Sequence, residues 1–303
     1  MKVAVLSGGV GGARFLRGLV EVVDPADVTV IGNVGDDVEI LGVHVSPDLD
    51  SILYTLAGLG DEERGWGRAD ETWHALETVE HLGGTSWFRL GDRDLGLHLV
   101  RTEALRAGEP LSSVTAELAR RAGLAVRLLP ATDDEVRTWI ETPAGSLPFQ
   151  VWFVDRGHRD EVDAVRYEGA ADARPAPGVI EAIDAADVIL FAPSNPYVSI
   201  GPILAVREIE DAIRRRSVPA VAVSPLIGGR AVRGPADRML ARLAGGTTPA
   251  HVASCYGDLI DVLVVDEADA HDLEHLAVRP VVAKTLMSDR DARRRLAETV
   301  LAA

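Results

Sequence analysis

The clearest chemical signal in the sequence is a run of glycines near its beginning. Segment 7–12 reads Ser-Gly-Gly-Val-Gly-Gly, so four of the five residues after Ser7 are glycine. The run follows a short apolar stretch and precedes an amphipathic one, and exposed N–H groups at such a strand-to-helix junction attract phosphate. A tight turn alone needs only one or two glycines. We therefore expect a phosphate-binding loop formed by Gly8, Gly9, Gly11 and Gly12.

This glycine loop does not match the common nucleotide fingerprints. A dinucleotide-binding motif would need a third Gly or Ala where Arg14 stands, and an acidic residue where Asn33 stands. A P-loop would need Gly-Lys followed by Ser or Thr, but the sequence has no lysine between Lys2 and Lys284. The loop therefore indicates phosphate binding but argues against an ordinary NAD or ATP site.

The residues that follow the loop are strongly acidic, which points to a divalent cation. From Gly18 through Glu63 there are eleven Asp or Glu residues and no Lys or Arg. Mg²⁺ prefers carboxylate oxygens together with substrate phosphates, and it removes the repulsion between these anions. A solvated acidic face is the better interpretation of Asp24, Asp27 and Glu62. Magnesium binding or general-base chemistry is expected of Asp37, Asp48 and Asp50.

Two later loops combine polar side chains with glycine and proline. Loop 193–202 contains Ser194, Asn195 and Ser199 among prolines, and helix capping would need only one of these residues. Loop 224–235 contains Arg233 among glycines, ahead of a proline that starts a helix, which suits a diphosphate. We expect these four side chains to bind phosphate or base edges. For Arg230, in the second loop, a plain surface position is an equally good interpretation.

Short β-branched runs alternate with longer helical patterns, which is typical of parallel βαβ units. The expected strands are Val3–Leu6, Val28–Ile31, Glu39–Val45, Val188–Phe191, Ala220–Val223 and Val262–Val265. The expected helices between and after them are Ala13–Val23, Ile203–Arg216, Pro235–Leu243, Ala268–Leu276 and Asp289–Leu301. The pattern predicts an α/β protein with a Rossmann-like parallel sheet. Because ligands of such sheets bind beyond the carboxyl ends of the strands, the loops should face one site.

The middle of the sequence departs from this alternation. It predicts helices at Glu71–Leu82, Leu95–Ala107 and Ser113–Ala122, then a hairpin of Val136–Thr142 and Leu147–Val154. Helices followed by a hairpin do not continue a parallel sheet. We therefore expect a core made of residues 1–60 and 170–303, with an inserted helical and β-hairpin lobe at 61–169. Within the lobe, Trp66 stands between two glycines and suits stacking on a flat ligand, whereas Trp73 and Trp152 are expected to pack internally.

Composition excludes several classes of protein. The 303 residues carry 31 basic and 47 acidic side chains, for a formal charge of −16, and 47% of them are hydrophobic. These values are typical of a soluble globular protein and argue against a nucleic-acid surface. A single cysteine, Cys255, fits a reducing compartment. No apolar run suits a membrane span or a signal peptide. We expect a cytoplasmic protein that binds neither nucleic acid nor membrane.

Taken together, the motifs resemble the 2-phospho-L-lactate transferase family of coenzyme F-420 biosynthesis. The most specific blocks are Leu-Gly-Asp-Arg-Asp at 90–94 and Pro-Ser-Asn-Pro at 193–196, in that order. Other matching blocks extend over most of the sequence: 7–14, 33–37, 46–50, 64–67, 70–73, 98–102, 129–134, 199–203 and 233–237.

The resemblance implies an enzyme that acts on small molecules, uses Mg²⁺ and forms a homodimer. Such an enzyme joins Fo, a deazaflavin with a ribityl chain, to a three-carbon acid activated by guanosine diphosphate, and it releases GMP. Blocks 64–67 and 70–74 look closer to the actinobacterial branch, which uses phosphoenolpyruvate in place of 2-phospholactate. The family's Fo contacts map onto Asp50 and Arg89, with Asp48 as the alternative to Asp50.

The resemblance also suggests how the reaction would proceed. The terminal ribityl hydroxyl of Fo would attack the phosphorus that bears the three-carbon acid, in line with departing GMP. Asp37 and one of Asp48 or Asp50 would hold Mg²⁺, and the remaining aspartate would accept the proton. The donor phosphates would lie against the glycine loop and Arg233.

Two other classes of function stay open. A non-catalytic nucleotide-sugar-binding regulator of the gluconeogenesis-factor type has a related fold and a similar glycine loop. Such a protein has no reason to keep the block at 90–94. A nicotinamide dehydrogenase is disfavoured by Arg14 and Asn33. The transferase is the preferred hypothesis, and the regulator is the alternative.

Overall fold

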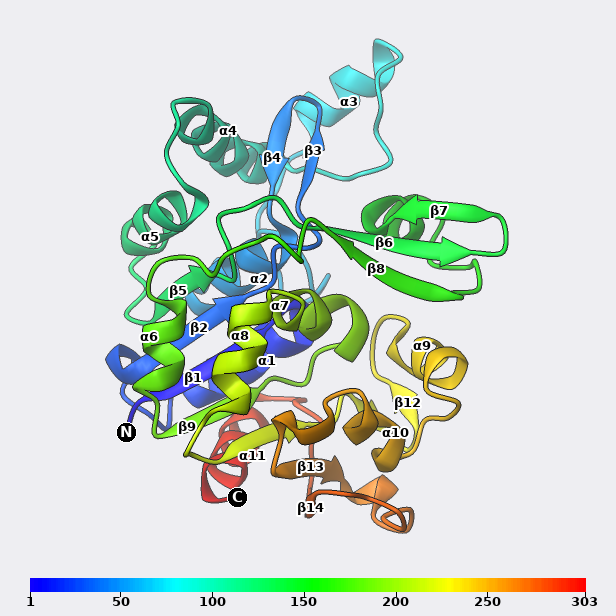
Figure 1. Ribbon diagram of the computed structural model, residues 1–303. Helices are drawn as coiled ribbons and strands as arrows, with labels where there is room; N and C mark the ends of the chain where they lie inside the picture. Colours follow the sequence, from blue (N-terminus) through cyan, green and yellow to red (C-terminus); the bar gives the residue numbers. More distant parts are fainter.

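The computed structural model describes residues 1–303, and its centre is one seven-stranded sheet (Figure 1). The strand order is β14-β13-β10-β9-β1-β2-β5, and every neighbouring pair is parallel. The strands are β1 (Val3–Ser7), β2 (Val28–Gly32), β5 (Arg127–Pro130), β9 (Val188–Phe191), β10 (Ala220–Val223), β13 (Val262–Asp266) and β14 (Arg279–Ala283). The predicted α/β class and Rossmann-like parallel sheet are confirmed.

The order of the strands reverses direction at β1. The chain runs outward from β1 through β2 to β5, then returns to β9 on the other side of β1 and runs outward through β10, β13 and β14. The carboxyl ends of β1 and β9 therefore meet at a topological switch point, which is where open α/β sheets bind their ligands.

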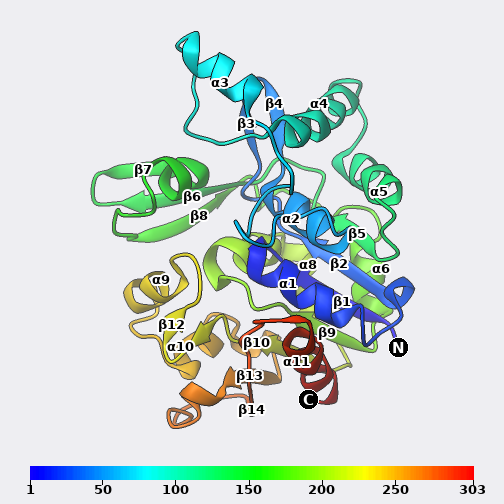
Figure 2. The same cartoon turned by 180° about the vertical axis from the view of Figure 1, so that it is seen from behind.

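Helices cover both faces of the sheet. One face carries α1 (Gly9–Leu19), α2 (Pro47–Leu56), α5 (Leu111–Arg121) and α11 (Arg290–Ala302), and Figure 2 shows α1, α2 and α11 in front of the strands. The other face carries α6 (Val179–Asp184), α7 (Gly201–Leu204), α8 (Arg207–Arg214), α9 (Ala236–Leu243) and α10 (Pro249–Ser254). Alternate residues of β1 pack into these two cores, which explains why the strand is apolar throughout.

The inserted lobe projects from the carboxyl edge of the sheet (Figure 1). It contains α3 (His74–His81), α4 (Asp92–Arg106) and an antiparallel sheet of order β7-β6-β8, made of β6 (Arg137–Thr142), β7 (Gly145–Pro148) and β8 (Ala164–Glu168). Strand β5 lies within segment 61–169 of the sequence but pairs with β2 at the edge of the main sheet. The division into two domains stays a prediction. No helix is both long and apolar enough to cross a membrane.

The strand predicted at Glu39–Val45 is wrong, because this segment is a tight hairpin of β3 (Val38–Ile40) and β4 (Val43–Val45). The two connecting residues, Leu41 and Gly42, both have positive φ angles, of 51° and 75°. Positive φ at both turn positions gives a two-residue turn whose twist matches that of the strands. The sequence pattern hid this turn because leucine is a rare residue at such a position.

Three other predicted elements are corrected. Segment 268–276 is not a helix: a short 3-10 turn at Glu267–Asp269 is followed by irregular chain, and the Asp269 carboxylate accepts hydrogen bonds from the Gly228 and Gly229 amides. Segment 203–216 divides into α7 and α8. The second hairpin strand ends at Pro148, and a π-helical turn at Val151–Asp155 buries Trp152.

The remaining short elements connect the large ones. Strands β11 (Leu226–Ile227) and β12 (Arg230–Ala231) form a small hairpin ahead of α9. A π-helical turn at Pro196–Ile200 follows β9, and 3-10 turns lie at Pro25–Asp27 and Gly257–Leu259. The lobe helices receive side-chain caps from a distance, since Glu71 accepts from the Arg93 and Asp94 amides of α4, and Asp92 accepts from the His74 and Ala75 amides of α3.

The first and last helices, α1 and α11, touch through backbone atoms. An added Cβ on Gly18 would lie 2.4 Å from the carbonyl oxygen of Arg293. Only a glycine permits this approach, so Gly18 fixes the distance between the two helices.

Replacing Gly18 by alanine is expected to lower the free energy of unfolding by about 1–3 kcal/mol, the usual cost of overpacking a close contact. A urea titration measures the change. The control is Gly96→Ala in α4, where an added Cβ meets no atom within 4 Å. That change should stabilise the protein by about 0.5–1 kcal/mol through helix propensity. A similar gain at both positions would contradict the close contact.

Candidate functional site

The first turn of α1 packs against two other segments so tightly that only glycine fits. An added Cβ on Gly8 would lie 2.5 Å from Asp48 Oδ2 and 2.8 Å from Ser199 Cβ. On Gly12 it would lie 2.3 Å from Ser7 Oγ. On Gly11 it would lie 2.5 Å from the Pro193 carbonyl oxygen. Close packing within the chain therefore accounts for three of the four glycines, Gly8, Gly11 and Gly12.

Gly9 is the exception among these glycines. Its φ angle is +67°, and an added Cβ would come no closer than 3.7 Å to its nearest neighbour, Ser199 Oγ. Its left-handed backbone, rather than crowding, favours glycine here. The sequence also predicted that α1 begins at Ala13, whereas the helix begins at Gly9, so the glycine run is the first helical turn.

The loop after β9 joins this turn through serine hydroxyls. Ser194 Oγ donates to the Gly8 carbonyl at 2.7 Å and accepts from the Gly8 amide at 3.4 Å. Ser199 is buried against Gly8. Asn195 Oδ1 accepts from the Tyr197 amide and caps the turn at 196–200, and binding of the donor by Asn195 stays a prediction. The structure thus brings Gly8, Ser194 and Ser199 together at the switch point.

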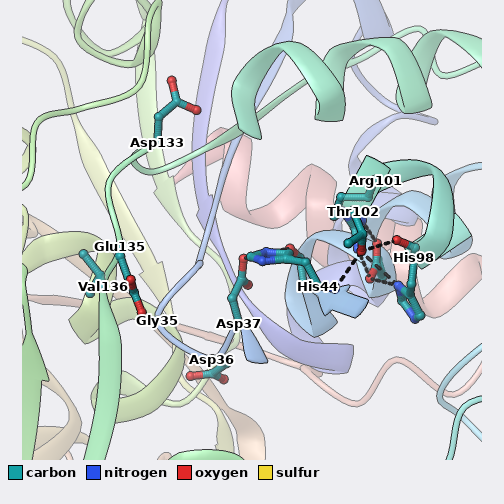
Figure 3. A network of polar contacts seen from close by, with 12 residues as sticks. Gly35, Asp36, Asp37, His44, His98, Arg101, Thr102, Asp133, Glu135 and Val136 are labelled. Carbon is teal, nitrogen blue, oxygen red and sulfur yellow. Dashed lines mark hydrogen bonds and ion pairs between the residues drawn. The ribbon is translucent and has the colours of Figure 1, made fainter. Parts of the chain in front are cut away.

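Four aspartates are buried near the same edge, and two of them have neutral or histidine partners. Asp37 Oδ2 accepts from Ser46 Oγ at 2.7 Å and lies 2.9 Å from His44 Nε2 (Figure 3). Asp48 Oδ2 accepts from the Asn33 side-chain amide at 2.9 Å. Asp48 and Asp50 occupy the first turn of α2, where the helix dipole stabilises negative charge.

Asp50 forms a buried ion pair with Arg101 of α4. Arg101 Nη1 donates to Asp50 Oδ2 at 3.0 Å, and Nη2 donates to Oδ1. Arg101 and His98 are each only 1% exposed, and His98 Nδ1 lies 3.7 Å from Asp50 Oδ2. His98 in turn lies 3.3 Å from Asp94, which accepts a hydrogen bond from the Tyr54 hydroxyl. Both carboxylate oxygens of Asp50 are therefore engaged.

Neither Arg101 nor His98 was singled out from the sequence. The signal was present, since both residues belong to the matching block 98–102 and stand three positions apart, which places them on one face of a helix. Asp36, which the sequence did not single out, is as deeply buried as its neighbour Asp37.

Burial and mutual repulsion change the acidity of two of these groups. Burial raises the pKa of Asp48 to about 6, against its usual 3.8, although hydrogen bonds from Asn33 and Gly9 oppose the shift. Burial, followed by the charge of Asp48, raises the pKa of Asp36 well above its usual value. Both shifts show that an added positive charge would be favourable here.

Several buried oxygens in this region have no hydrogen-bond partner. They are Ser7 Oγ, Asp36 Oδ1 and Asp37 Oδ1. Buried polar atoms are nearly always paired, so these atoms fit contact with a ligand or a hard cation. As the side chains stand, no three His, Cys, Asp or Glu groups converge closely enough to hold a metal ion. Asp37 and Asp48 suit magnesium, whereas Asp50 would first have to leave Arg101.

Trp66 and Arg89, the expected Fo contacts other than Asp50, share a second surface. The Arg89 guanidinium lies 4.5 Å from the ring centre of Trp73, and Trp73 packs edge-on against Trp66 at 6.4 Å. Arg64 lies over both rings, at 4.9 Å and 5.2 Å. Trp66 is 42% exposed. Trp73 therefore joins an exposed cation–π cluster instead of packing inside the lobe as predicted.

Arg233 lies against this aromatic cluster. Its guanidinium covers Gly65, and its Nη1 donates to the Arg64 carbonyl oxygen at 3.3 Å. Its hydrogen bond thus joins loop 224–235 to segment 64–67. Binding of a diphosphate by Arg233 stays a prediction.

Comparisons with known proteins identify the family of this chain. The family model described as 2-phospho-L-lactate transferase CofD matches residues 3–303. A relative from Streptomyces griseus named phosphoenolpyruvate transferase is 48% identical over 99% of this chain and 98% of its own length. A relative of the same name from Streptomyces coelicolor is 47% identical over 99% of this chain and 97% of its own length.

A solved structure supports the fold independently. A protein of the UPF0052 family from Bacillus halodurans superposes with a TM-score of 0.67, covering 99% of both chains at 19% identity. This likeness shows the fold alone. The family match over nearly the whole length, together with relatives close to half identical, shows that the chain belongs to the 2-phospho-L-lactate transferase CofD family and is a transferase.

Proposed function

We propose that the enzyme transfers a phosphoenolpyruvyl group from a guanosine diphosphate-linked donor to the terminal ribityl hydroxyl of Fo. The products are dehydro coenzyme F-420-0 and GMP. The names of the relatives from Streptomyces griseus and Streptomyces coelicolor support phosphoenolpyruvate over 2-phospholactate as the transferred acid. The observation that carries the proposal is the group of buried carboxylates, some with unpartnered oxygens, beside the Gly8 turn.

The transfer exchanges one phosphorus–oxygen bond for another. The ribityl oxygen bonds to the phosphorus that bears the enolpyruvyl group, and the bond from that phosphorus to GMP breaks. The electron pair leaves with the phosphate oxygen of GMP, and the hydroxyl proton passes to a carboxylate of the cluster. No oxidant or reductant is required.

Asp37 and Asp48 are the residues best suited to hold Mg²⁺. Asp37 Oδ1 has no partner, and the raised pKa of Asp48 reflects a carboxylate that gains from a nearby cation. A bound magnesium ion would neutralise charge on the diphosphate. Asp50 is held by Arg101, and this pairing suits it to orient the ribityl hydroxyl rather than to bind metal.

Fo would place its flat ring system on the aromatic cluster. Trp66, Trp73 and Arg89 form a continuous surface of rings and guanidinium, and a deazaflavin stacks on such a surface through dispersion and cation–π contact. The plainer alternative, a nucleotide-binding regulator, predicts nucleotide binding without release of GMP. We also propose that the protein works as a homodimer in the cytoplasm.

The central experiment incubates the enzyme with Fo, Mg²⁺ and either the phosphoenolpyruvyl or the phospholactyl donor. Mass spectrometry should detect dehydro coenzyme F-420-0 and GMP from the first donor. Asp48→Asn should lower turnover by about 100-fold or more, because charge neutralisation at the phosphates supplies much of the rate. The control is Asp172→Asn, at an exposed position, which should behave like the wild type. Nucleotide binding without product from either donor would favour the regulator.

The stability of the metal-free protein should depend on pH through Asp48. Because burial raises the pKa of Asp48 from 3.8 to about 6, the folded state holds this proton more tightly than the unfolded state does. The proton on Asp48 therefore stabilises the folded state. This contribution is complete below the unfolded pKa of 3.8 and is lost as pH rises through the folded pKa of about 6. Asp48→Asn carries no charge to bury. The free energy of unfolding of the Asp48→Asn variant should therefore increase relative to that of the wild type as pH rises.

Urea titrations of both proteins in EDTA, at pH values from about 5 to 8, measure this difference. A difference that does not change with pH would contradict a raised Asp48 pKa. Adding Mg²⁺ at the upper end should then stabilise the wild type more than the variant, because a ligand that binds only the folded state stabilises it.

Trp66→Ala should weaken Fo binding. Loss of one stacking face is expected to raise the KM for Fo by about tenfold and to change kcat little. Steady-state kinetics with Fo as the varied substrate measure both constants. The matched control is Trp139→Ala in β6, where the tryptophan stacks with Arg166 outside the cluster. Equal KM values for wild type and Trp66→Ala would remove Trp66 from the Fo site.

A further inference from the structure

A small basic pocket lies on the flank of α1, between α2, segment 58–67 and α11. Its volume is about 90 Å³. Arg14 and Arg17 of α1 and Arg293 of α11 reach it, and Trp66 lies at its wall. The reaction proposed above assigns no role to these three arginines.

The positive charges in this pocket are only partly balanced. Arg17 pairs with Glu62, and the other acidic residue at the pocket, Asp61, is bound by Arg64. Arg293 is only 9% exposed, and its buried Nε has no hydrogen-bond partner. The half-buried Arg14 takes part in no ion pair or side-chain hydrogen bond of the structure.

The arginines also repel one another. Burial, followed by the charges of Arg233 and Arg293, lowers the pKa of Arg14 below its ordinary value. Gathering uncompensated guanidinium groups in a partly desolvated place is unfavourable unless an anion offsets it. Guanidinium presents paired N–H donors that match the oxygens of a phosphate group, and a pocket of this volume admits one.

We propose that Arg14, Arg17 and Arg293 form a binding site for the phosphate group of a phosphorylated ligand, separate from the glycine turn at Gly8. The Glu62 carboxylate competes with that phosphate for Arg17. Glu62 is attracted to all three arginines: a hydrogen bond and the charge of Arg17, followed by the charges of Arg293 and Arg14, hold the pKa of Glu62 below its ordinary value.

The ligand is a phosphate or diphosphate ester, from one of two sources. Trp66 belongs both to this pocket and to the aromatic cluster, so the phosphate of a guanine nucleotide reaching from the transfer site is one source. A separate phosphorylated metabolite is the other. The proposed phosphate site can be tested independently of the proposed reaction, because the experiment measures binding in the absence of Fo.

The test is isothermal titration of inorganic pyrophosphate into the full-length enzyme in EDTA, without Fo. Wild type should bind it. Arg14→Gln and Arg293→Gln should each weaken binding by about tenfold or more, because each removes a charge-assisted contact. Glu62→Gln should strengthen binding by removing the competing carboxylate. The control, Arg294→Gln, changes a neighbouring arginine that pairs with Glu298 on α11 and should leave binding unchanged.

Thermal unfolding checks that each variant is folded. Arg14→Gln keeps the test informative if the more buried Arg293 variant is unstable. Failure of the wild type to bind pyrophosphate, or unchanged binding by a folded Arg14→Gln variant, would overturn the proposal. A competition arm with GMP separates the two sources: displacement of pyrophosphate assigns the site to the nucleotide, and retained binding assigns it to a separate phosphorylated compound.

Discussion

Repulsion among four buried carboxylates governs how the carboxyl edge of the sheet is built. Asp36, Asp37, Asp48 and Asp50 come from two neighbouring segments, and each must find compensation without bulk water. The chain supplies a serine and a histidine to Asp37, an asparagine to Asp48 and an arginine to Asp50. The compensation is incomplete: Asp36 and Asp48 have raised pKa values, and one oxygen each of Asp36 and Asp37 has no hydrogen-bond partner. This remaining negative charge is the basis on which a cation that carries a diphosphate is proposed for the site.

The same electrostatic demand ties the inserted lobe to the core. Arg101 of α4 is the only fully charged partner of Asp50 and is itself buried, so neither side chain can lose the other without leaving an unpaired buried charge. The β3–β4 hairpin is also tied to α4, because the His44 backbone amide donates a hydrogen bond to the Thr102 hydroxyl (Figure 3). Helix α4 is thereby fixed over the first turn of α2, and the lobe becomes one wall of the site.

The sequence predicts well what depends on local pattern and poorly what depends on distant contacts. Strands β9 and β10 have the predicted bounds, because each is a continuous apolar run between chain-breaking residues. Segment 268–276 has a helical pattern, yet the Asp269 carboxylate binds amides some 40 residues away. The pairing of Asp50 with Arg101 spans 51 positions, and no spacing rule encodes it. Phosphate binding by the glycine loop stays a prediction, and the crowding of these glycines by Asp48, Pro193 and Ser7 is visible only in three dimensions.

The contact between α1 and α11 has a consequence for biosynthesis. Helix α1 is synthesised well before α11, the helix that packs against it at the Gly18–Arg293 contact. The apolar side of α1 that packs with Leu296 and Val300 therefore stays uncovered until α11 has been synthesised. The packing of α1 against α11 is thus completed only after all seven strands of the sheet have been synthesised.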